Sequence, residues 1–109
     1  SVGETYVRFA LANPMLYRLM FDMVGVARGR YPDLDAAGAR ARETMTGYVR
    51  DLIGAGLLVG EPVVVGHLFW AALHGLLMLK LSGQLDDAPG FDALRTAMQQ
   101  ALVFGLAPR

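Results

Sequence analysis

The run FWAALHGLLMLKLSGQL, residues 69–85, constrains the fold of this sequence more than any other feature. On a helix, its apolar side chains and those just before it point to both sides, with little that is polar between them. A helix that is hydrophobic all round must be buried all round. Sister helices can cover one side, so something else must cover the other. One side carries His67, Trp70, Ala71, His74, Met78 and Leu81, and the opposite side carries Phe69, Leu73, Leu76 and Lys80.

The composition points the same way. The chain has 109 residues, which predicts one domain, and 54% of them are hydrophobic while 18% are charged. Ordinary domains are about 25% charged. A small domain has a high ratio of surface to volume, so this apolar excess favours a partner surface, a lipid surface or an internal ligand cavity.

Charge and cysteine content exclude several classes of function. The formal net charge is zero, whereas proteins that bind nucleic acids usually carry a basic patch, so we do not expect this chain alone to bind DNA or RNA. The absence of cysteine excludes disulfides, thiolate catalysis and thiolate metal sites. Glu4 and Arg8 interrupt the apolar pattern of the first residues, so no cleavable signal is expected.

Helical periodicity and its punctuation predict an all-α bundle of five helices. Asn13 and Pro14 end the first helix and begin the second, with Asn13 as an N-cap. Asp33 or Asp35 is expected to cap the third helix. No stretch alternates with period two for long, so no sheet is expected. The predicted ranges are up to about 13, 14 to about 25, 33 or 35 to about 55, 62 to about 83, and 91 to about 105.

Two covers for the fourth helix can be weighed. The run Val63–Leu79 is just short of the roughly 20 residues of a membrane span, and it contains two histidines, so we expect no membrane association. A second copy of the chain is the preferred cover. Small residues let helices approach closely, and both the fourth and the fifth helix are rich in them. Two helices from each of two subunits would then form a four-helix interface about a two-fold axis.

Two segments resemble the signatures of a known family. YVRFALANPMLYRLMFD, residues 6–22, and FWAALHGLLMLKLSGQL are similar to the C-terminal domain of TetR/AcrR-type transcriptional regulators. The second segment resembles the Trp-His-Gly pattern of the WHG subgroup through Trp70, His74 and Gly75. The resemblance extends from Tyr6 to about Leu106 and includes AGLL at 55–58.

The resemblance implies a cytoplasmic bacterial regulator that works without a cofactor and is not an enzyme. It implies a homodimer formed through the last two helices and a pocket for a small-molecule effector among the earlier helices. It also implies an N-terminal helix-turn-helix domain, so we expect this chain to be a fragment that contacts DNA only through that missing domain. On this reading residues 1–109 are the ligand-binding and dimerisation domain.

Site residues follow from the inward stripes together with the resemblance. Aromatic and methionine side chains with a few polar tips are the usual lining of an apolar effector pocket, although each of them could equally be core. The predicted pocket residues are Tyr6, Phe9, Leu16, Met20, Phe21, Met45, Tyr48, Trp70 and His74. The predicted dimer residues are Gly66, Phe69, Ala72, Leu73, Gly75, Leu76, Leu94, Met98, Ala101 and Leu102.

Metal and catalytic sites are not expected. His67 and His74 are seven residues apart, about 10.5 Å along a helix, whereas two ligands of one metal are normally about one turn apart. No spacing suggests a Ser-His-acid arrangement or a phosphate-binding loop. Three functions therefore stay open, in falling order: the effector-sensing domain, a stand-alone helical protein-interaction module without a ligand pocket, and a small helical enzyme.

Overall fold

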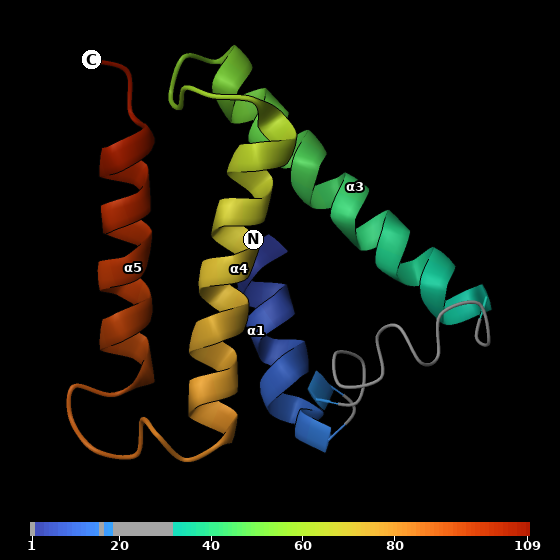
Figure 1. Cartoon of the computed structure of the whole chain (residues 1–109), viewed down its shortest axis with the longest axis vertical. Coiled ribbons are helices and arrows are strands. Elements are labelled where there is room, and N and C mark those ends of the chain that lie inside the picture. Colours follow the sequence, from blue (N-terminus) through green and yellow to red (C-terminus); the bar gives the residue numbers. More distant parts are fainter. Residues whose placement is uncertain (1, 16, 19–31) are drawn as a thin grey trace. The chain divides into compact units, whose positions relative to one another are not determined.

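The computed structural model describes residues 2–15, 17–18 and 32–109. This part of the chain contains four α-helices and no strand, which confirms the all-helical class. Most of the predicted second helix lies outside the described residues, so the count of five helices stays a prediction. The helices, labelled as in Figure 1, are α1 (Val2–Ala12), α3 (Pro32–Gly54), α4 (Pro62–Leu81) and α5 (Phe91–Leu106).

The chain divides into two compact units, residues 1–44 and 45–109, and each is described by itself. The first unit buries three side chains among its described residues, Val7, Ala10 and Tyr17. Tyr17 is completely buried, and its ring meets the ring of Tyr6 edge to face with centroids 5.7 Å apart. An aromatic pair of this geometry stabilises a fold beyond the area it buries.

Asn13 marks the boundary after α1 but does not cap in the predicted direction. Its side-chain Nδ2 donates a 3.0 Å hydrogen bond to the carbonyl oxygen of Phe9, so the side chain satisfies the C-terminal end of α1. Its own carbonyl oxygen accepts from the backbone N–H of Tyr17, and residues 14–15 and 17–18 are helical. The expected break at Asn13 and Pro14 is therefore confirmed, whereas the N-capping role of the Asn13 side chain is wrong.

The predicted ends of α3 need one correction. The helix begins at Pro32, so Asp33 and Asp35 lie inside its first turn and neither is its cap. Its C-terminal end is closed by two backbone bonds, from Leu57 N–H to the Leu52 carbonyl and from Gly56 N–H to the Ile53 carbonyl. This pair of bonds places Gly56 at φ +79°, a left-handed conformation that favours glycine.

The core of the second unit lies where α3 ends and α4 begins. Val49, Leu58 and Val65 are nearly inaccessible and form one cluster. The loop between α3 and α4 is also fastened to the end of α5, because the Val59 N–H donates a 2.7 Å hydrogen bond to the Leu106 carbonyl oxygen. Partly buried side chains complete the cluster: Leu52, Ile53, Phe69 and Leu106.

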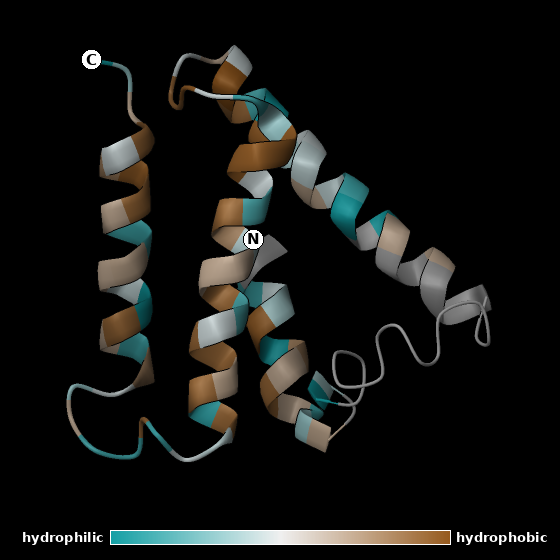
Figure 2. Cartoon of the chain, in the orientation of Figure 1, coloured by the Kyte–Doolittle hydropathy of each residue, from teal (hydrophilic) through white to brown (hydrophobic). Residues whose placement is uncertain are grey.

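The predicted bounds of α4 are confirmed. The Glu61 carboxylate accepts a 2.9 Å hydrogen bond from the Val64 N–H, and Pro62 occupies the first helical position, where its missing N–H costs nothing. Gly83 ends the helix at φ +79° with the same pair of backbone bonds that closes α3. Figure 2 shows that α4 is hydrophobic along nearly its whole length, whereas α3 alternates between apolar and polar residues.

The fifth predicted helix is also confirmed within one residue. α5 runs antiparallel to α4 and packs along it, connected by the loop 82–90 (Figure 1). Phe91 is buried at its start, and Leu94, Met98 and Leu102 are half-buried along its length. Because these four residues recur every three to four positions, they form the side of α5 that packs within its own chain.

Candidate functional site

The most unusual surface of the second unit is the outward side of α4. Over the most apolar 18 residues of this helix only 22% of residues are buried. Five of the exposed positions recur at intervals of four, three, four and four residues, so they lie on one side of the helix. Val63 and His67 are also exposed but do not belong to this set. None of the five carries a charge. We name this set the α4 stripe; it consists of Val64, Leu68, Ala71, Gly75 and Leu79.

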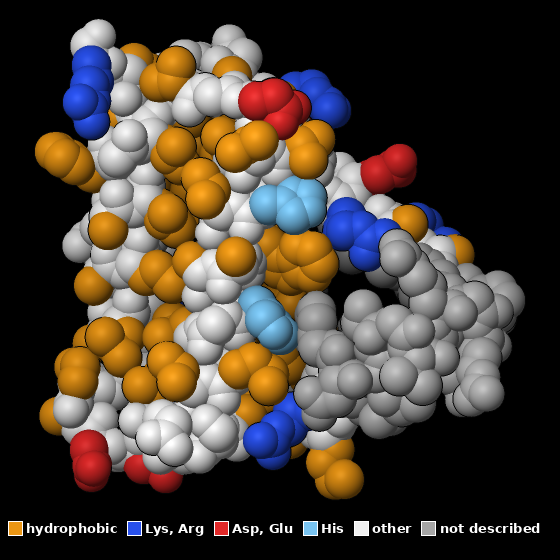
Figure 3. Space-filling model, viewed as in Figure 1, with side chains coloured by type: hydrophobic (Ala, Val, Ile, Leu, Met, Phe, Trp, Pro, Cys, Tyr) orange, Lys and Arg blue, Asp and Glu red, His pale blue; other side chains and the backbone are white. Residues whose placement is uncertain are grey.

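The three large members of the α4 stripe are well exposed, with 57% of Val64, 44% of Leu68 and 47% of Leu79 accessible. Gly75 is open above its backbone, since a Cβ atom built there would meet no atom within 4 Å. Figure 3 shows hydrophobic side chains gathered over both α4 and α5 on the face in view. A contiguous apolar surface of this kind marks an interaction site in a small protein.

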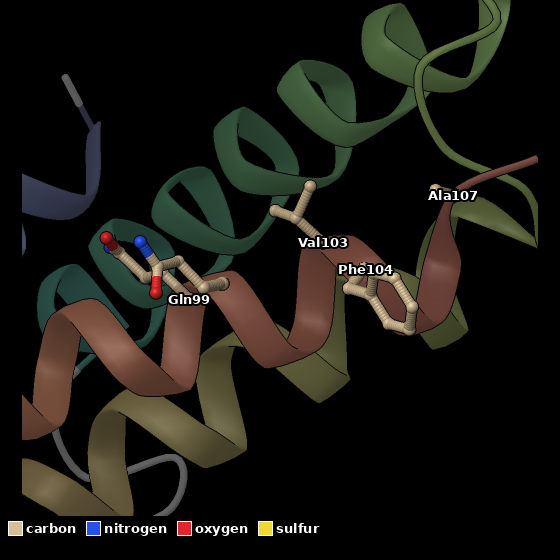
Figure 4. A pocket seen from close by; sticks show the side chains of 5 residues that line it. Gln99, Val103, Phe104 and Ala107 are labelled. Atoms are coloured by element: carbon tan, nitrogen blue, oxygen red, sulfur yellow. The ribbon is translucent and has the colours of Figure 1, made fainter.

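α5 contributes a shallow, open groove near its C-terminal end. Val103, Phe104 and Ala107 line it together with Gln99 and Gln100, and Figure 4 shows these side chains along one side of the helix. The Phe104 side chain is 84% exposed. Because the groove is open and mostly apolar, it is better suited to a flat contact with another protein surface than to the enclosure of a small molecule.

The predicted pocket residues are spread over both units. In the first unit Tyr6 is half-buried and Phe9 is 38% exposed. In the second unit Met45, Trp70 and His74 are half-buried, while Tyr48 is 53% exposed. Each unit is placed by itself, so a common pocket stays a prediction. Three further predicted pocket residues lie outside the described residues: Leu16, Met20 and Phe21.

Tyr17 is a polar core residue that the sequence reading did not single out. Its hydroxyl lies 2.8 Å from the hydroxyl of Tyr6, within hydrogen-bonding distance. Burial, followed by the hydrogen bond and the nearby phenol of Tyr6, raises the pKa of Tyr17 far above its ordinary value. Tyr17 therefore stays neutral at any physiological pH. Eleven residues separate Tyr6 from Tyr17. On one continuous helix they would share a side but lie about 16 Å apart, so their contact depends on the break at Asn13 and not on helical periodicity.

The predicted dimer residues fall into three groups: exposed, buried and half-buried. Ala101 and Gly75 are exposed, whereas Gly66 and Leu76 are buried by their own chain. Near Gly66 the closest neighbour is the Met45 side chain, 3.5 Å from where a Cβ would stand. The remaining predicted residues are half-buried: Phe69, Ala72, Leu73, Leu94, Met98 and Leu102.

The two histidines of α4 have different surroundings. Nδ1 of His67 lies 2.7 Å from the Val63 carbonyl oxygen, and the His67 ring meets Trp70 edge to face at 5.8 Å. His74 is half-buried, and this burial lowers its pKa below the ordinary histidine value. Within the described ranges no three histidine, aspartate or glutamate side chains are grouped so that they could hold a metal ion.

By length and composition alone, α4 is a helix that could cross a membrane, a test that the core helix of a soluble protein also passes. Comparison with family models matches residues 1–102 to the tetracyclin repressor-like, C-terminal domain family. No curated protein and no solved structure showed a match to the chain. The family match covers the first compact unit, residues 45–102 of the second unit and all of α4.

Proposed function

Since the chain belongs to the tetracyclin repressor-like, C-terminal domain family, we propose that residues 1–109 form the effector-sensing and dimerisation domain of a TetR-type transcriptional regulator. A regulatory domain for ligand binding and dimerisation is what the family implies in general. The proposal for this chain rests on the family match together with the low burial of the apolar helix α4. Domains of this family are typically regulatory, and we propose no catalytic site for this chain.

Dimerisation would bury the exposed apolar side of α4. The α4 stripe is apolar, and α5 exposes the large apolar side chains Val103 and Phe104. Hydrophobic side chains over both helices lie on a common face (Figure 3). A second copy that presents the same two helices would remove both surfaces from water. This supports a homodimer built on the last two helices, in which exposed residues such as Gly75 and Ala101 make the contact.

Effector binding is proposed for the nine predicted pocket residues, which lie before α4 and along α4 as far as His74. In the first unit Tyr6 supplies a phenol. In the second unit Trp70 supplies an indole and His74 an imidazole whose pKa is lowered by burial. Such a lining suits an apolar or amphipathic molecule with one or two hydrogen-bonding groups. The WHG character of Trp70, His74 and Gly75 belongs to the same proposal.

Regulation requires that the effector bind one arrangement of the dimer better than another. The shift in equilibrium is set by that difference in affinity. The arrangement in turn would control how an N-terminal helix-turn-helix domain of the parent protein meets DNA in the cytoplasm. No part of residues 1–109 needs to touch DNA for this mechanism.

A stand-alone helical interaction module is the second candidate, and the exposed Phe104 beside an open groove favours it. Native mass spectrometry of the purified chain separates the two. A mass of twice 11.8 kDa with a bound small molecule is expected for the effector-sensing dimer. A monomer without any adduct would reject that function and favour the interaction module.

A further inference from the structure

When the α4 stripe is paired with a reversed copy of itself about Ala71, Leu68 falls opposite Gly75 and Val64 falls opposite Leu79. The two ends of the stripe are large, with Val64 at one and Leu79 at the other, and its centre is the small Ala71. Between centre and ends stand Leu68 on one side and Gly75 on the other, a large residue and the smallest one. The stripe is therefore complementary to itself when one copy is reversed.

The space above Gly75 is the part of this pattern that the structure shows directly. A Cβ atom at Gly75 would meet nothing within 4 Å, so the backbone there is uncovered by its own chain. Leu68 lies two helical turns away, and its side chain is 44% exposed. A second copy in the reverse direction brings a Leu68 side chain opposite each Gly75. The Leu68 side chain of each copy then fills the open space above Gly75 of the other.

We propose that α4 pairs with α4 of a second copy, antiparallel about a two-fold axis near Ala71, with Leu68 of each copy packed on Gly75 of the other. This register rests on the proposed homodimer and deepens it. The same contacts occur twice, as a two-fold interface requires. Intervals of four, three, four and four residues are close to the spacing of helices that pack at a shallow angle with interlocking side chains.

The extent of the surface also fits a second copy. A helix of 20 residues is about 30 Å long, and a stable interface buries about 800 Å² on each partner. One helix side supplies part of that area, and the hydrophobic side chains over α5 on the same face supply more (Figure 3). The stripe contains no charged residue, so it does not favour a charged partner. Its order of large and small side chains fits a second copy of the same helix in the reverse direction.

Cysteine cross-linking tests the register, because the chain has no cysteine of its own. Under mild oxidation Ala71→Cys is expected to give a covalent dimer. A mixture of Leu68→Cys and Gly75→Cys chains is expected to give cross-linked heterodimers. Each of these two alone should remain mostly uncrosslinked, because identical residues are then about 10 Å apart along the axis, beyond the reach of a disulfide. Val63→Cys, exposed on α4 but outside the stripe, is the matched control.

Native mass spectrometry in parallel distinguishes the failure of this register from the failure of the proposed function. A dimer that cross-links neither through Ala71→Cys nor in the Leu68→Cys and Gly75→Cys mixture overturns the register and leaves the homodimer standing. A chain that stays monomeric overturns both. A chain that dimerises only with lipid vesicles present overturns the pairing of α4 with itself.

A size exchange supplies a second test. Gly75→Leu fills the hollow and is expected to raise the dimer dissociation constant at least about tenfold, since overpacking opposes close approach. Leucine is also a better helix former than glycine, so circular dichroism should show an intact helix. Adding Leu68→Ala to Gly75→Leu moves the large side chain to the other position and should restore most of the affinity. A double variant as weak as Gly75→Leu alone would contradict the proposed contact.

Discussion

The hydroxyl groups of Tyr6 and Tyr17 lie 2.8 Å apart, and this pair joins α1 to the helical residues after Asn13. Tyr17 is fully buried, so the bond acts where water cannot replace it. We expect Tyr6→Phe to destabilise the chain by about 1 kcal/mol, because a buried hydroxyl loses one of its partners. Urea unfolding measures this. Tyr17→Phe removes the buried hydroxyl itself and should cost less; a larger cost for Tyr17→Phe would contradict the account.

The raised pKa of Tyr17 predicts a loss of stability in alkali. The neutral phenol is favoured by folding, so its contribution is complete below the ordinary tyrosine pKa and is lost as the pH rises above it toward the folded value. We expect the free energy of unfolding to fall above about pH 10. The Tyr17→Phe chain should fall less steeply. Equal slopes for both chains would show that Tyr17 is not the group responsible.

The neighbours Leu57 and Leu58, in the loop between α3 and α4, differ strongly in burial. Leu58 is 4% exposed within the Val49 and Val65 cluster, whereas Leu57 is 59% exposed. Leu58→Ala is expected to cost about 2–5 kcal/mol, the usual range for a cavity in a core. Leu57→Ala, the matched control, should change stability by less than about 0.5 kcal/mol. Thermal unfolding of both variants checks the difference.

The helix boundaries were predictable because specific residues impose them. Pro62 fits only the first turn of α4, and Gly83 takes the left-handed conformation that closes it. Asn13 shows where this reasoning stops. The side chain of an asparagine between two helices can hydrogen-bond to the start of the second helix or to the end of the first. The local path of the chain decides between them, and here Asn13 bonds to the Phe9 carbonyl oxygen.

The orientation of α4 could not be predicted from sequence for a related reason. A helix that is apolar on every side has no pattern that tells its inward from its outward side. Sequence reasoning therefore grouped Gly66 and Leu76 with Gly75 as interface residues, although the first two are buried within their own chain. The exposed Val64, Leu68 and Leu79 could be identified only from the packing of α4 against its neighbours.

Glu61 caps α4 through a side chain that must be ionised to accept well. The Val64 N–H, and after it the Val63 N–H, hold the pKa of Glu61 below the ordinary glutamate value. Its contribution is therefore complete above the ordinary pKa and is lost as the pH falls through the lower folded value. We expect Glu61→Ala to lower the urea midpoint at pH 7. At pH 2 the midpoints of the two chains should converge, and a difference as large as at pH 7 would argue against the cap.

The lowered pKa of His74 predicts how the stability of the chain changes between pH 5 and pH 7. Burial lowers its pKa, so between the folded and the unfolded pKa the unfolded chain binds more protons and stability rises with pH. We expect the His67→Gln chain, which retains His74 as its single histidine, to show an NMR titration below pH 6.5. Its unfolding free energy should increase from pH 5 to pH 7. His74→Gln should remove this increase. A His74 titration at or above pH 6.5 would mean that protonation carries no cost in the folded chain, and the imidazole would then not be held neutral for an effector.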